Sequence, residues 1–364
     1  MINAVIGGGI ASIIMYGVVN WKETDLRKIK HVFLNTNYKV GDFAPKLVRK
    51  TSRDDKTEYI FSVPYGLVDR EDLQPILEKT LAKDVEVKFR GKLIIYVYNK
   101  RMPTRINYDW EQSEKWTVPI GESREGMVVH DFDKIPHMTI AGMTRYGKTV
   151  LLKLLFAHII NGNPSAEFYV LDLKGGLEFG KYENLSQVRE VASDVGEALE
   201  TLSHITSEIK SDMQTFKSRG INNIVNSSID RRRFIIVDEG AELDAKCHDK
   251  LSEVARIGGA LGYRLIYATQ YPTADTLPRQ IKQNSDAKIS FRLPTKVASR
   301  VAVDENGAEE LAYPGRAIYR THVRKIIQVP FVDDSEIYDR LRRFEDATVK
   351  IEDNPSRKNT IELG

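Results

Sequence analysis

The segment Gly142–Thr149 has the residue types and the spacing of a phosphate-binding loop, G-x-x-x-x-G-K-[ST]. Its glycines allow a tight turn, so that successive backbone N–H groups and the start of the next helix face the phosphates. Lys148 would bring a positive charge to the β- and γ-phosphates, and the Thr149 hydroxyl could ligate Mg²⁺. The apolar run before the loop predicts a strand and the run after it predicts a helix, which is the context that this loop requires.

We therefore expect the loop and the residue that follows it to bind the phosphates of ATP. These residues are Gly142, Met143, Thr144, Arg145, Tyr146, Gly147, Lys148, Thr149 and Val150. Arg145 and Tyr146 fill variable positions of the pattern, and their side chains could contact the base, contact a phosphate or face solvent.

A second motif begins with four apolar residues, Phe234–Val237, which run directly into Asp238 and Glu239. Such a run predicts a buried strand whose C-terminal end meets the ligand. Alone, it could equally be a strand that enters an acidic loop. Coupled to the phosphate-binding loop, it predicts that Asp238 holds Mg²⁺, directly or through water, and that Glu239 orients and deprotonates the attacking water. The pair thus indicates ATP hydrolysis, with ATP and Mg²⁺ as cofactors.

Polar residues also lie before the acidic strand Phe234–Val237 and after a second apolar run, Leu265–Ala268. Arg231, Arg232 and Arg233 precede the acidic strand, so we expect them to be remote from ATP and solvated. Leu265–Ala268 is another apolar strand, and it leads to Thr269 and Gln270. If it lies beside the Asp238 strand, Gln270 would project towards the γ-phosphate and could report hydrolysis to the moving parts. A plain strand end is the alternative.

The elements that must hold these side chains indicate an α/β fold. Apolar, β-rich runs alternate with helical stretches at His137–Ala141, Phe168–Leu173, Phe234–Val237, Leu265–Ala268 and Ala287–Phe291. Near-continuous apolar runs separated by helices are typical of a parallel sheet covered on both faces. We predict a P-loop ATPase domain over residues 122–340, followed by a polar tail at 341–364.

Residues 22–110 indicate a separate small α+β module, with a linker to about residue 121. Glu58–Val63 reads as a strand, and a helix that starts no earlier than Asp72 extends to Leu81, because Pro75 is tolerated only in its first turn. Two further runs, Val85–Phe89 and Leu93–Tyr98, are separated by Arg-Gly-Lys and predict a hairpin.

The N-terminus and the composition bear on location. Residues 2–21 carry no charge and are followed by a basic flank, which predicts a candidate membrane anchor with a cytoplasmic motor behind it. A buried or frayed apolar N-terminus is the alternative, because of the run Gly7–Gly9. Cys247 is the only cysteine, which excludes an intrachain disulfide and a multi-cysteine zinc site. A net charge of +3 is compatible with a nucleic-acid partner without implying one.

The chain resembles the FtsK/SpoIIIE DNA translocases, particularly their shorter relatives on conjugative elements of Gram-positive bacteria. The resemblance covers roughly residues 118–332. It rests on Lys134–Gly142 before the phosphate-binding loop, Tyr169–Lys174, Arg219–Ile224, Val237–Glu239, Ala268–Gln270 and Thr295–Arg300.

The resemblance implies a RecA-like motor fold and a ring, a homo-hexamer, with DNA threaded through the centre. It places Lys148 and Thr149 on nucleotide and magnesium, Asp238 and Glu239 on metal and water, and Gln270 in a sensor position. Many members have an arginine where this chain has Gly259. We therefore expect Arg256 or Arg300 to reach the γ-phosphate of a neighbouring subunit.

The predicted function is an ATP-dependent DNA translocase or coupling ATPase that serves conjugative transfer, with relaxase or transfer-channel proteins as partners. A motor for another polymer, such as a secretion ATPase, would share the ATP site. A membrane-tethered nucleotide switch would also use the loop, but it would not need Glu239. Lys282, Lys288 and Arg292 are candidate DNA contacts, and a solvated face is the alternative.

Overall fold

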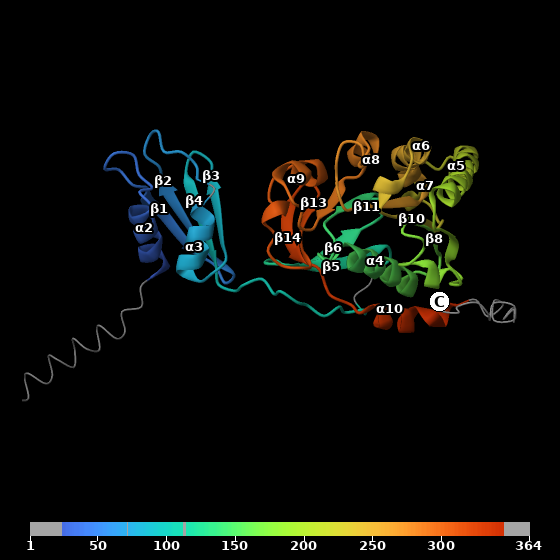
Figure 1. Ribbon diagram of the computed structural model, residues 1–364, viewed down its shortest axis with the longest axis horizontal. Coiled ribbons are helices and arrows are strands. Elements are labelled where there is room, and N and C mark those ends of the chain that lie inside the picture. The colour runs from blue at the N-terminus through green and yellow to red at the C-terminus, as the bar shows by residue number, and fades with distance from the viewer. Residues whose placement is uncertain (1–23, 71, 112–113, 346–364) are drawn as a thin grey trace, which may run out of the picture. The chain divides into compact units, whose positions relative to one another are not determined.

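The computed structural model describes residues 24–70, 72–111 and 114–345, and it divides the chain into two compact units between Met102 and Pro103 (Figure 1). The division falls within the segment from Lys100 to about Gly121 in which the sequence predicts the linker. The end of that segment is part of the second unit, because Thr117–Ser123 pairs as a strand within its large sheet. The candidate anchor at residues 2–21 lies outside the described residues. In the described part, no helix is long and apolar enough to cross a membrane.

The first unit is a four-stranded antiparallel sheet with two helices. Its elements are α2 (Asp25–Asn35), β1 (Lys46–Ser52), β2 (Lys56–Ser62), α3 (Leu73–Leu81), β3 (Val85–Phe89) and β4 (Leu93–Tyr98), with the strand order β1-β2-β4-β3. The predicted hairpin and the start of the second helix are confirmed. Alternate residues of β4 point to the core, where Phe33 of α2 and Phe61 of β2 meet edge to face.

The second unit contains a ten-stranded sheet within the described residues, in the order β6-β5-β14-β13-β12-β7-β11-β10-β8-β9. Its elements are β5 (Thr117–Ser123), β6 (Gly126–Asp131), β7 (Met138–Ala141), α4 (Lys148–Gly162), β8 (Ala166–Asp172), β9 (Val188–Ala192), α5 (Val195–Ser218), β10 (Arg232–Asp238), α6 (Ala245–Glu253), α7 (Gly259–Leu261), β11 (Tyr263–Thr269), α8 (Arg279–Asn284), β12 (Ala287–Ser290), α9 (Lys296–Val303), β13 (Arg316–Arg320), β14 (Arg324–Gln328) and α10 (Asp334–Leu341).

The strands from β12 to β9 in this order are parallel, as the sequence predicted, and they hold the centre of the sheet. The strands β13, β14, β5 and β6 extend it by antiparallel pairing. Because parallel neighbours end at the same edge, Ala141, Asp172, Asp238 and Thr269 line up at one edge of the sheet. That edge carries the candidate site.

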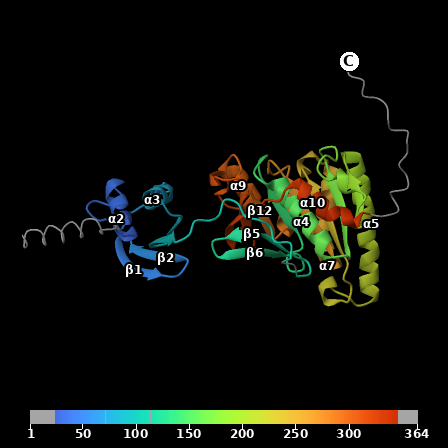
Figure 2. The same ribbon diagram turned by 90° about the horizontal axis from the view of Figure 1, so that it is seen from below.

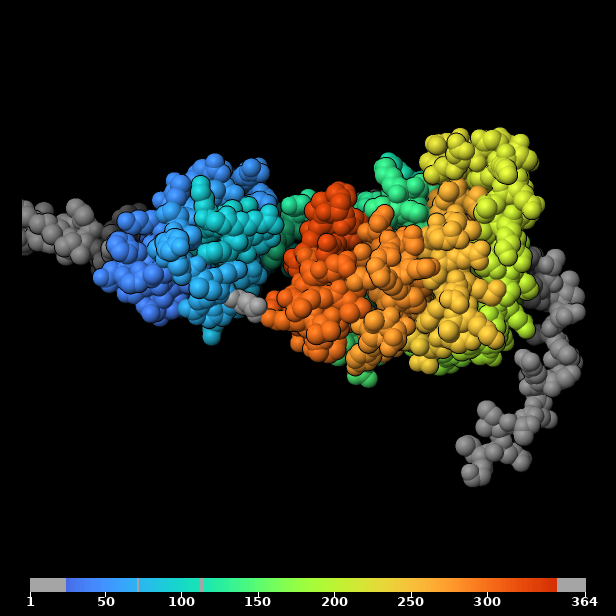
Figure 3. Space-filling model, turned by 90° about the horizontal axis from the view of Figure 1, so that it is seen from above, coloured from blue at the N-terminus to red at the C-terminus, as the bar shows by residue number. Residues whose placement is uncertain are grey.

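Helices cover both faces of the parallel strands, so the strands are apolar on both sides. On one face α4 packs with α10 (Figure 2). Phe168, Phe234 and Ile236 belong to the core that includes these two helices. On the other face, Ile235 and Val237 belong to the core that includes α5 and α6. In Figure 3 the segment that contains α5 lies at one end of this unit and is coloured yellow-green.

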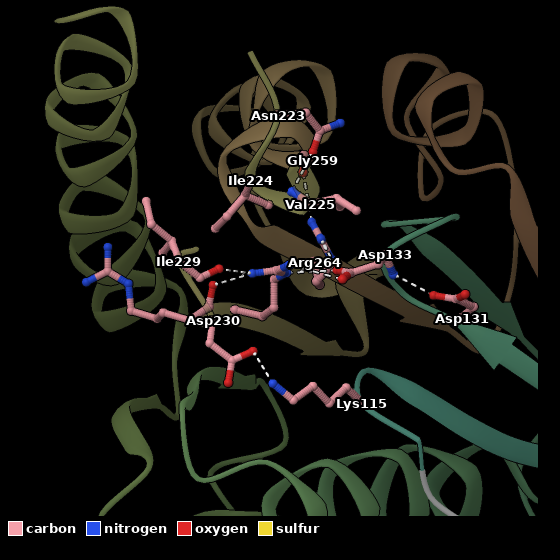
Figure 4. A network of polar contacts seen from close by, with 12 residues as sticks. Lys115, Asp131, Asp133, Asn223, Ile224, Val225, Ile229, Asp230, Gly259 and Arg264 are labelled. Atoms are coloured by element: carbon pink, nitrogen blue, oxygen red, sulfur yellow. Dashed lines mark hydrogen bonds and ion pairs between the residues drawn. The ribbon is translucent and has the colours of Figure 1, made fainter. Parts of the chain in front are cut away.

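At the opposite edge of the sheet, Asp133 joins two strands. Its carboxylate accepts hydrogen bonds from Arg232 of β10, at 2.8 and 3.0 Å, and from Arg264 of β11, at 2.7 Å (Figure 4). Burial alone would raise the pKa of Asp133, but the two guanidinium groups lower it below its usual value. The prediction that the three arginines are solvated is wrong for Arg232 and Arg233, which are buried in ion pairs. Arg231 is partly exposed.

Candidate nucleotide site

The phosphate-binding loop connects β7 to α4 in the conformation that the pattern predicts. Gly147 has a φ of +112°, which L side chains rarely adopt, and Arg145 also lies in the left-handed region. Phe291 packs closely against Gly142. A Cβ at position 142 would lie only 2.6 Å from Cβ of Phe291, so the position favours glycine. The amide of Met143 donates to the Arg292 carbonyl at 3.0 Å, which ties the loop to the segment after β12.

Helix α4 begins at Lys148 and is buried almost all round, from Leu151 to Ile160. A helix that is apolar on every side belongs in a core. Its first turn therefore has a fixed position, and its free N–H groups and the positive end of its dipole face the site. Lys153, which also lies on α4, pairs with Glu178 at 2.7 Å and with Asp334 of α10 at 2.8 Å.

Four charged side chains meet at the edge of the sheet. Lys148, with 4% of its side chain exposed, donates to Oδ1 of the fully buried Asp238, and its Nζ lies 3.7 Å from Oε2 of Glu239. Lys174 places its Nζ 3.6 Å from Oδ2 of Asp238 and 3.9 Å from Oε2 of Glu239. The cluster has two positive and two negative formal charges, so it carries no excess positive charge for a triphosphate.

Glu239 is held in one orientation. Its Oε1 accepts hydrogen bonds from the Gln270 backbone amide, at 3.0 Å, and from the Thr269 hydroxyl, at 3.3 Å. Its own φ is +67°, a strained value that is typical of functional positions. The chain can turn here because Gly240 follows, where a Cβ would lie 2.2 Å from the Tyr267 ring. The orientation of the Glu239 carboxylate therefore depends on the position of the end of β11, at Thr269 and Gln270.

The two acidic residues fit a magnesium site. Oδ2 of Asp238 and Oε2 of Glu239 are buried and have no hydrogen-bond partner among the described residues. Buried oxygens of this kind need a partner, and carboxylate oxygens suit Mg²⁺ and its bound waters. Thr149, in the first turn of α4, follows Lys148, which contacts both carboxylates.

A cavity of about 580 Å³ extends from this cluster, within the range of ligand pockets. Of the residues named from the sequence, the cavity brings together Met143, Thr144, Arg145, Gly147, Lys148, Thr149, Val150 and Gln270. Gly142 and Tyr146 do not line the cavity. Tyr146 packs against the hydrophobic core, and its backbone carbonyl accepts a hydrogen bond from the Gly315 amide at 2.9 Å.

The two candidate trans-acting arginines do not line this cavity. Arg256 is exposed in a π-helical turn, Val254–Gly258, that precedes β11 and so lies towards the other edge of the sheet. Arg300 is exposed on α9, where its Nε donates to Asn306 at 2.9 Å. At Gly259 a Cβ would lie 3.0 Å from the Pro136 side chain. An arginine at this position would therefore have to displace Pro136.

Sequence reasoning did not assign a role to Lys174. Asp172 shapes the loop that carries it, because Oδ2 of Asp172 accepts the amides of Glu178 and Phe179 at 2.8 and 2.9 Å. Lys174 comes directly after the predicted strand Phe168–Leu173. Since parallel strands end at the same edge of a sheet, this position could have indicated that Lys174 lies near Asp238.

The candidate DNA-binding cations are held by other groups. Lys282 and Lys288 both pair with Asp304, at 2.7 and 3.0 Å. Arg292 lies over the Tyr146 ring, 5.8 Å from its centroid, and donates to the Leu311 carbonyl. Arg292 thus supports the phosphate-binding loop from the adjacent strand end.

The fold and the site define a RecA-like P-loop ATPase domain. The family description that matches the sequence, over residues 104–319, is FtsK/SpoIIIE. This match covers more than half of the chain, and the chain belongs to the FtsK/SpoIIIE family.

Similarity to individual proteins is lower. DNA translocase FtsK of Lactiplantibacillus plantarum is 28% identical over 272 residues, which is 66% of this chain and 34% of that protein. DNA translocase FtsK of Streptococcus agalactiae is 26% identical over 356 residues, 87% of this chain and 43% of that protein. The chain thus spans less than half the length of these relatives.

Solved structures share the fold. The pCW3 conjugation coupling protein TcpA, in its monomer form with ATPγS, has a TM-score of 0.64 at 21% identity, covering 87% of this chain and 98% of that one. The cytoplasmic domain of the type VII secretion ATPase EccC of Thermomonospora curvata has a TM-score of 0.56 at 21% identity, covering 66% of this chain and 33% of that one.

Proposed function

We propose that this protein hydrolyses ATP and uses the energy to move DNA, as a translocase or coupling ATPase. One observation carries the proposal: Lys148, which lines the cavity, contacts two buried carboxylates, and one of these, Glu239, binds the backbone amide of Gln270 at the end of a neighbouring strand. A site that only binds nucleotide does not require an oriented carboxylate next to the phosphates. Glu239 is such a carboxylate, and this argues against a switch that binds ATP without turnover.

The residues divide the chemistry of phosphoryl transfer among them. Lys148 and the amides of the loop bind the β- and γ-phosphates, while Glu239 accepts a proton from the attacking water. Thr149 and Asp238 would hold Mg²⁺, which neutralises phosphate charge when bound. A divalent cation is needed because the four charged side chains cancel one another and leave the triphosphate uncompensated.

Gln270 connects hydrolysis to movement in this proposal. Its backbone amide binds Glu239, and its side chain faces the cavity. When the attacking water is consumed and the γ-phosphate leaves, the hydrogen bonding of Glu239 changes. The end of β11 is the first backbone segment to respond.

The DNA substrate rests on the family, and the process rests on the likeness to a conjugation coupling protein in fold. We infer a role in conjugative transfer, with a relaxase or transfer-channel protein as partner. For residues 2–21 we propose a membrane anchor, with the motor in the cytoplasm. The anchor is tested by membrane fractionation of the full chain and of a chain that starts at Lys22. Equal solubility of the two chains would contradict the anchor.

The function is tested by ATP turnover in the presence of different polymers. Duplex DNA, single-stranded DNA and an unfolded polypeptide are added separately to the full chain, and phosphate release is followed. We expect DNA to raise the rate and the polypeptide to leave it unchanged. Stimulation by the polypeptide alone would favour the secretion motor, and ATP binding without turnover would favour the switch.

A ring is the second part of the proposal, because neither Arg256 nor Arg300 reaches the cavity of its own chain. In a homo-hexamer one of them would meet the γ-phosphate of the neighbouring subunit. Arg256→Ala or Arg300→Ala should then lower DNA-stimulated turnover on the order of a thousandfold or more, as the loss of an arginine finger does. Arg231→Ala, which removes a partly exposed arginine outside the cavity, is the matched control.

Mixing separates action across an interface from damage to the fold. An inactive Arg256→Ala subunit combined with an inactive Lys148→Met subunit should recover part of the turnover. The reason is that some interfaces then pair an intact loop with an intact arginine. If both arginine variants hydrolyse ATP at the normal rate, neither residue has this role.

A further inference from the structure

The nucleotide cavity has a second end that none of the residues above explains. Its wall comes from the start of the second unit and from the segments next to β13 and β14: Thr104, Arg105, Pro314, Pro330 and Phe331. Backbone hydrogen bonds connect this wall to the phosphate-binding loop. The Gly315 amide donates to Tyr146, the Val329 amide donates to Gly315 at 2.8 Å, and the Phe331 amide donates to Ile106 at 3.3 Å.

The side chains of this end present flat surfaces. Phe331 has 46% of its surface exposed, although Val329 and Pro330 before it and Val332 after it are buried. The Arg105 guanidinium lies over the Phe331 ring, 5.1 Å from its centroid. A guanidinium that lies over an exposed aromatic ring offers, together with that ring, planar surfaces on which a heterocycle stacks favourably.

A polar side chain also lines this end of the cavity. Gln328, which is 2% exposed, donates from Nε2 to the Pro314 carbonyl at 3.1 Å and so fixes the turn that bears Pro314. Its Oε1 is buried and has no hydrogen-bond partner among the described residues. This end therefore offers a stacking surface together with one unpaired acceptor.

We propose that Phe331 and Arg105 form the nucleobase subsite, on which the base of a nucleoside triphosphate stacks. This inference rests on the proposed function, because it takes Lys148 and Thr149 as the phosphate end of the same cavity. With the phosphates bound there, the nucleoside extends into the rest of the cavity, which Arg105 and Phe331 also line.

The subsite also reaches the segment that leads in from the first unit. Pro103 is the first residue of the second unit, and its carbonyl accepts a hydrogen bond from Arg316 at 3.0 Å. Arg105 follows two residues later. A bound base would therefore hold this segment in place, whereas bound phosphates alone would not.

Binding measurements test the subsite. The full chain and its variants are titrated with ATP, with GTP and with inorganic tripolyphosphate, each with Mg²⁺. Phe331→Ala should weaken ATP and GTP about tenfold, as the loss of a stacking ring does, and leave tripolyphosphate unchanged. Phe331→Tyr, which keeps the ring, should bind all three normally. Tyr338→Ala, on α10 outside the cavity, is the matched aromatic control.

Trypsin cleavage after Arg105 gives an independent readout. ATP should protect this bond in the wild-type chain, and tripolyphosphate should not. If Phe331→Ala and Arg105→Ala both keep the wild-type preference for ATP over tripolyphosphate, the base binds elsewhere and the subsite is wrong, while the ATPase proposal stands. If the wild-type chain binds neither ligand, the proposed function itself fails.

Discussion

Glu239→Gln should retain ATP binding and lower ATP turnover by about a hundredfold to ten-thousandfold, the usual cost of losing a general base. The amide keeps the shape of the side chain and can still accept hydrogen bonds from Thr269 and from the Gln270 amide. It cannot accept a proton from water. The variant should therefore hold ATP and remain on DNA without moving. Calorimetric binding and phosphate release, measured on the same preparation, provide the check.

Glu242→Gln is the matched control for this change. Glu242 is exposed in the turn that follows Glu239, so its amide should leave binding and turnover unchanged. Normal turnover in Glu239→Gln would show that Glu239 is not the base. A loss of ATP binding would show instead that the negative charge holds Lys148 and Lys174 in place, and the switch alternative would gain support.

Lys148→Met should lower ATP turnover by on the order of a hundredfold to a thousandfold or more, the cost of losing one preorganised charge in the transition state, and it should also weaken ATP binding. Lys148 contacts the phosphates before the reaction as well as during it, so binding and rate both suffer. The structure adds a second effect. Removal of Lys148 leaves Asp238 and Glu239 buried with only Lys174 nearby, which should cost about 3 kcal/mol of stability.

A double variant separates the two effects. Adding Asp238→Asn to Lys148→Met removes the uncompensated charge, so the melting temperature should recover while ATP binding stays weak. Melting of the single variant should fall by roughly 6 to 12 °C. An unchanged melting temperature in the single variant would mean that Lys174 alone compensates both carboxylates. Normal ATP binding in either variant would contradict the role of Lys148.

Much of the site could be predicted because its residues are local in sequence. The loop between β7 and α4 and the acidic end of β10 each form one short pattern, and parallel strands bring their ends to one edge. The burial of α4 also follows from its composition. The fold could be predicted to the same extent, since the parallel strands are continuous apolar runs.

The hairpin of β3 and β4 was predicted, but other antiparallel strands could not be found in this way. β14 begins with Arg324 and Lys325, and β1 exposes most of its polar side chains as an edge strand, so neither shows an apolar run. The proposed base end of the cavity depends on β14, because Phe331 follows this strand and meets Arg105 from a segment more than two hundred residues earlier. Contacts at that distance leave no local pattern.

The carboxylate that joins Arg232 to Arg264 has a consequence for how this sequence can change over evolution. Each arginine belongs to a different strand, and both depend on the single negative charge of Asp133. Loss of Asp133 alone would leave two buried cations, at a cost of several kcal/mol. The three positions can therefore be inherited or replaced only as a set. In related sequences we expect a neutral residue at position 133 to occur together with neutral residues at 232 and 264, and an alignment in which they vary independently would contradict this.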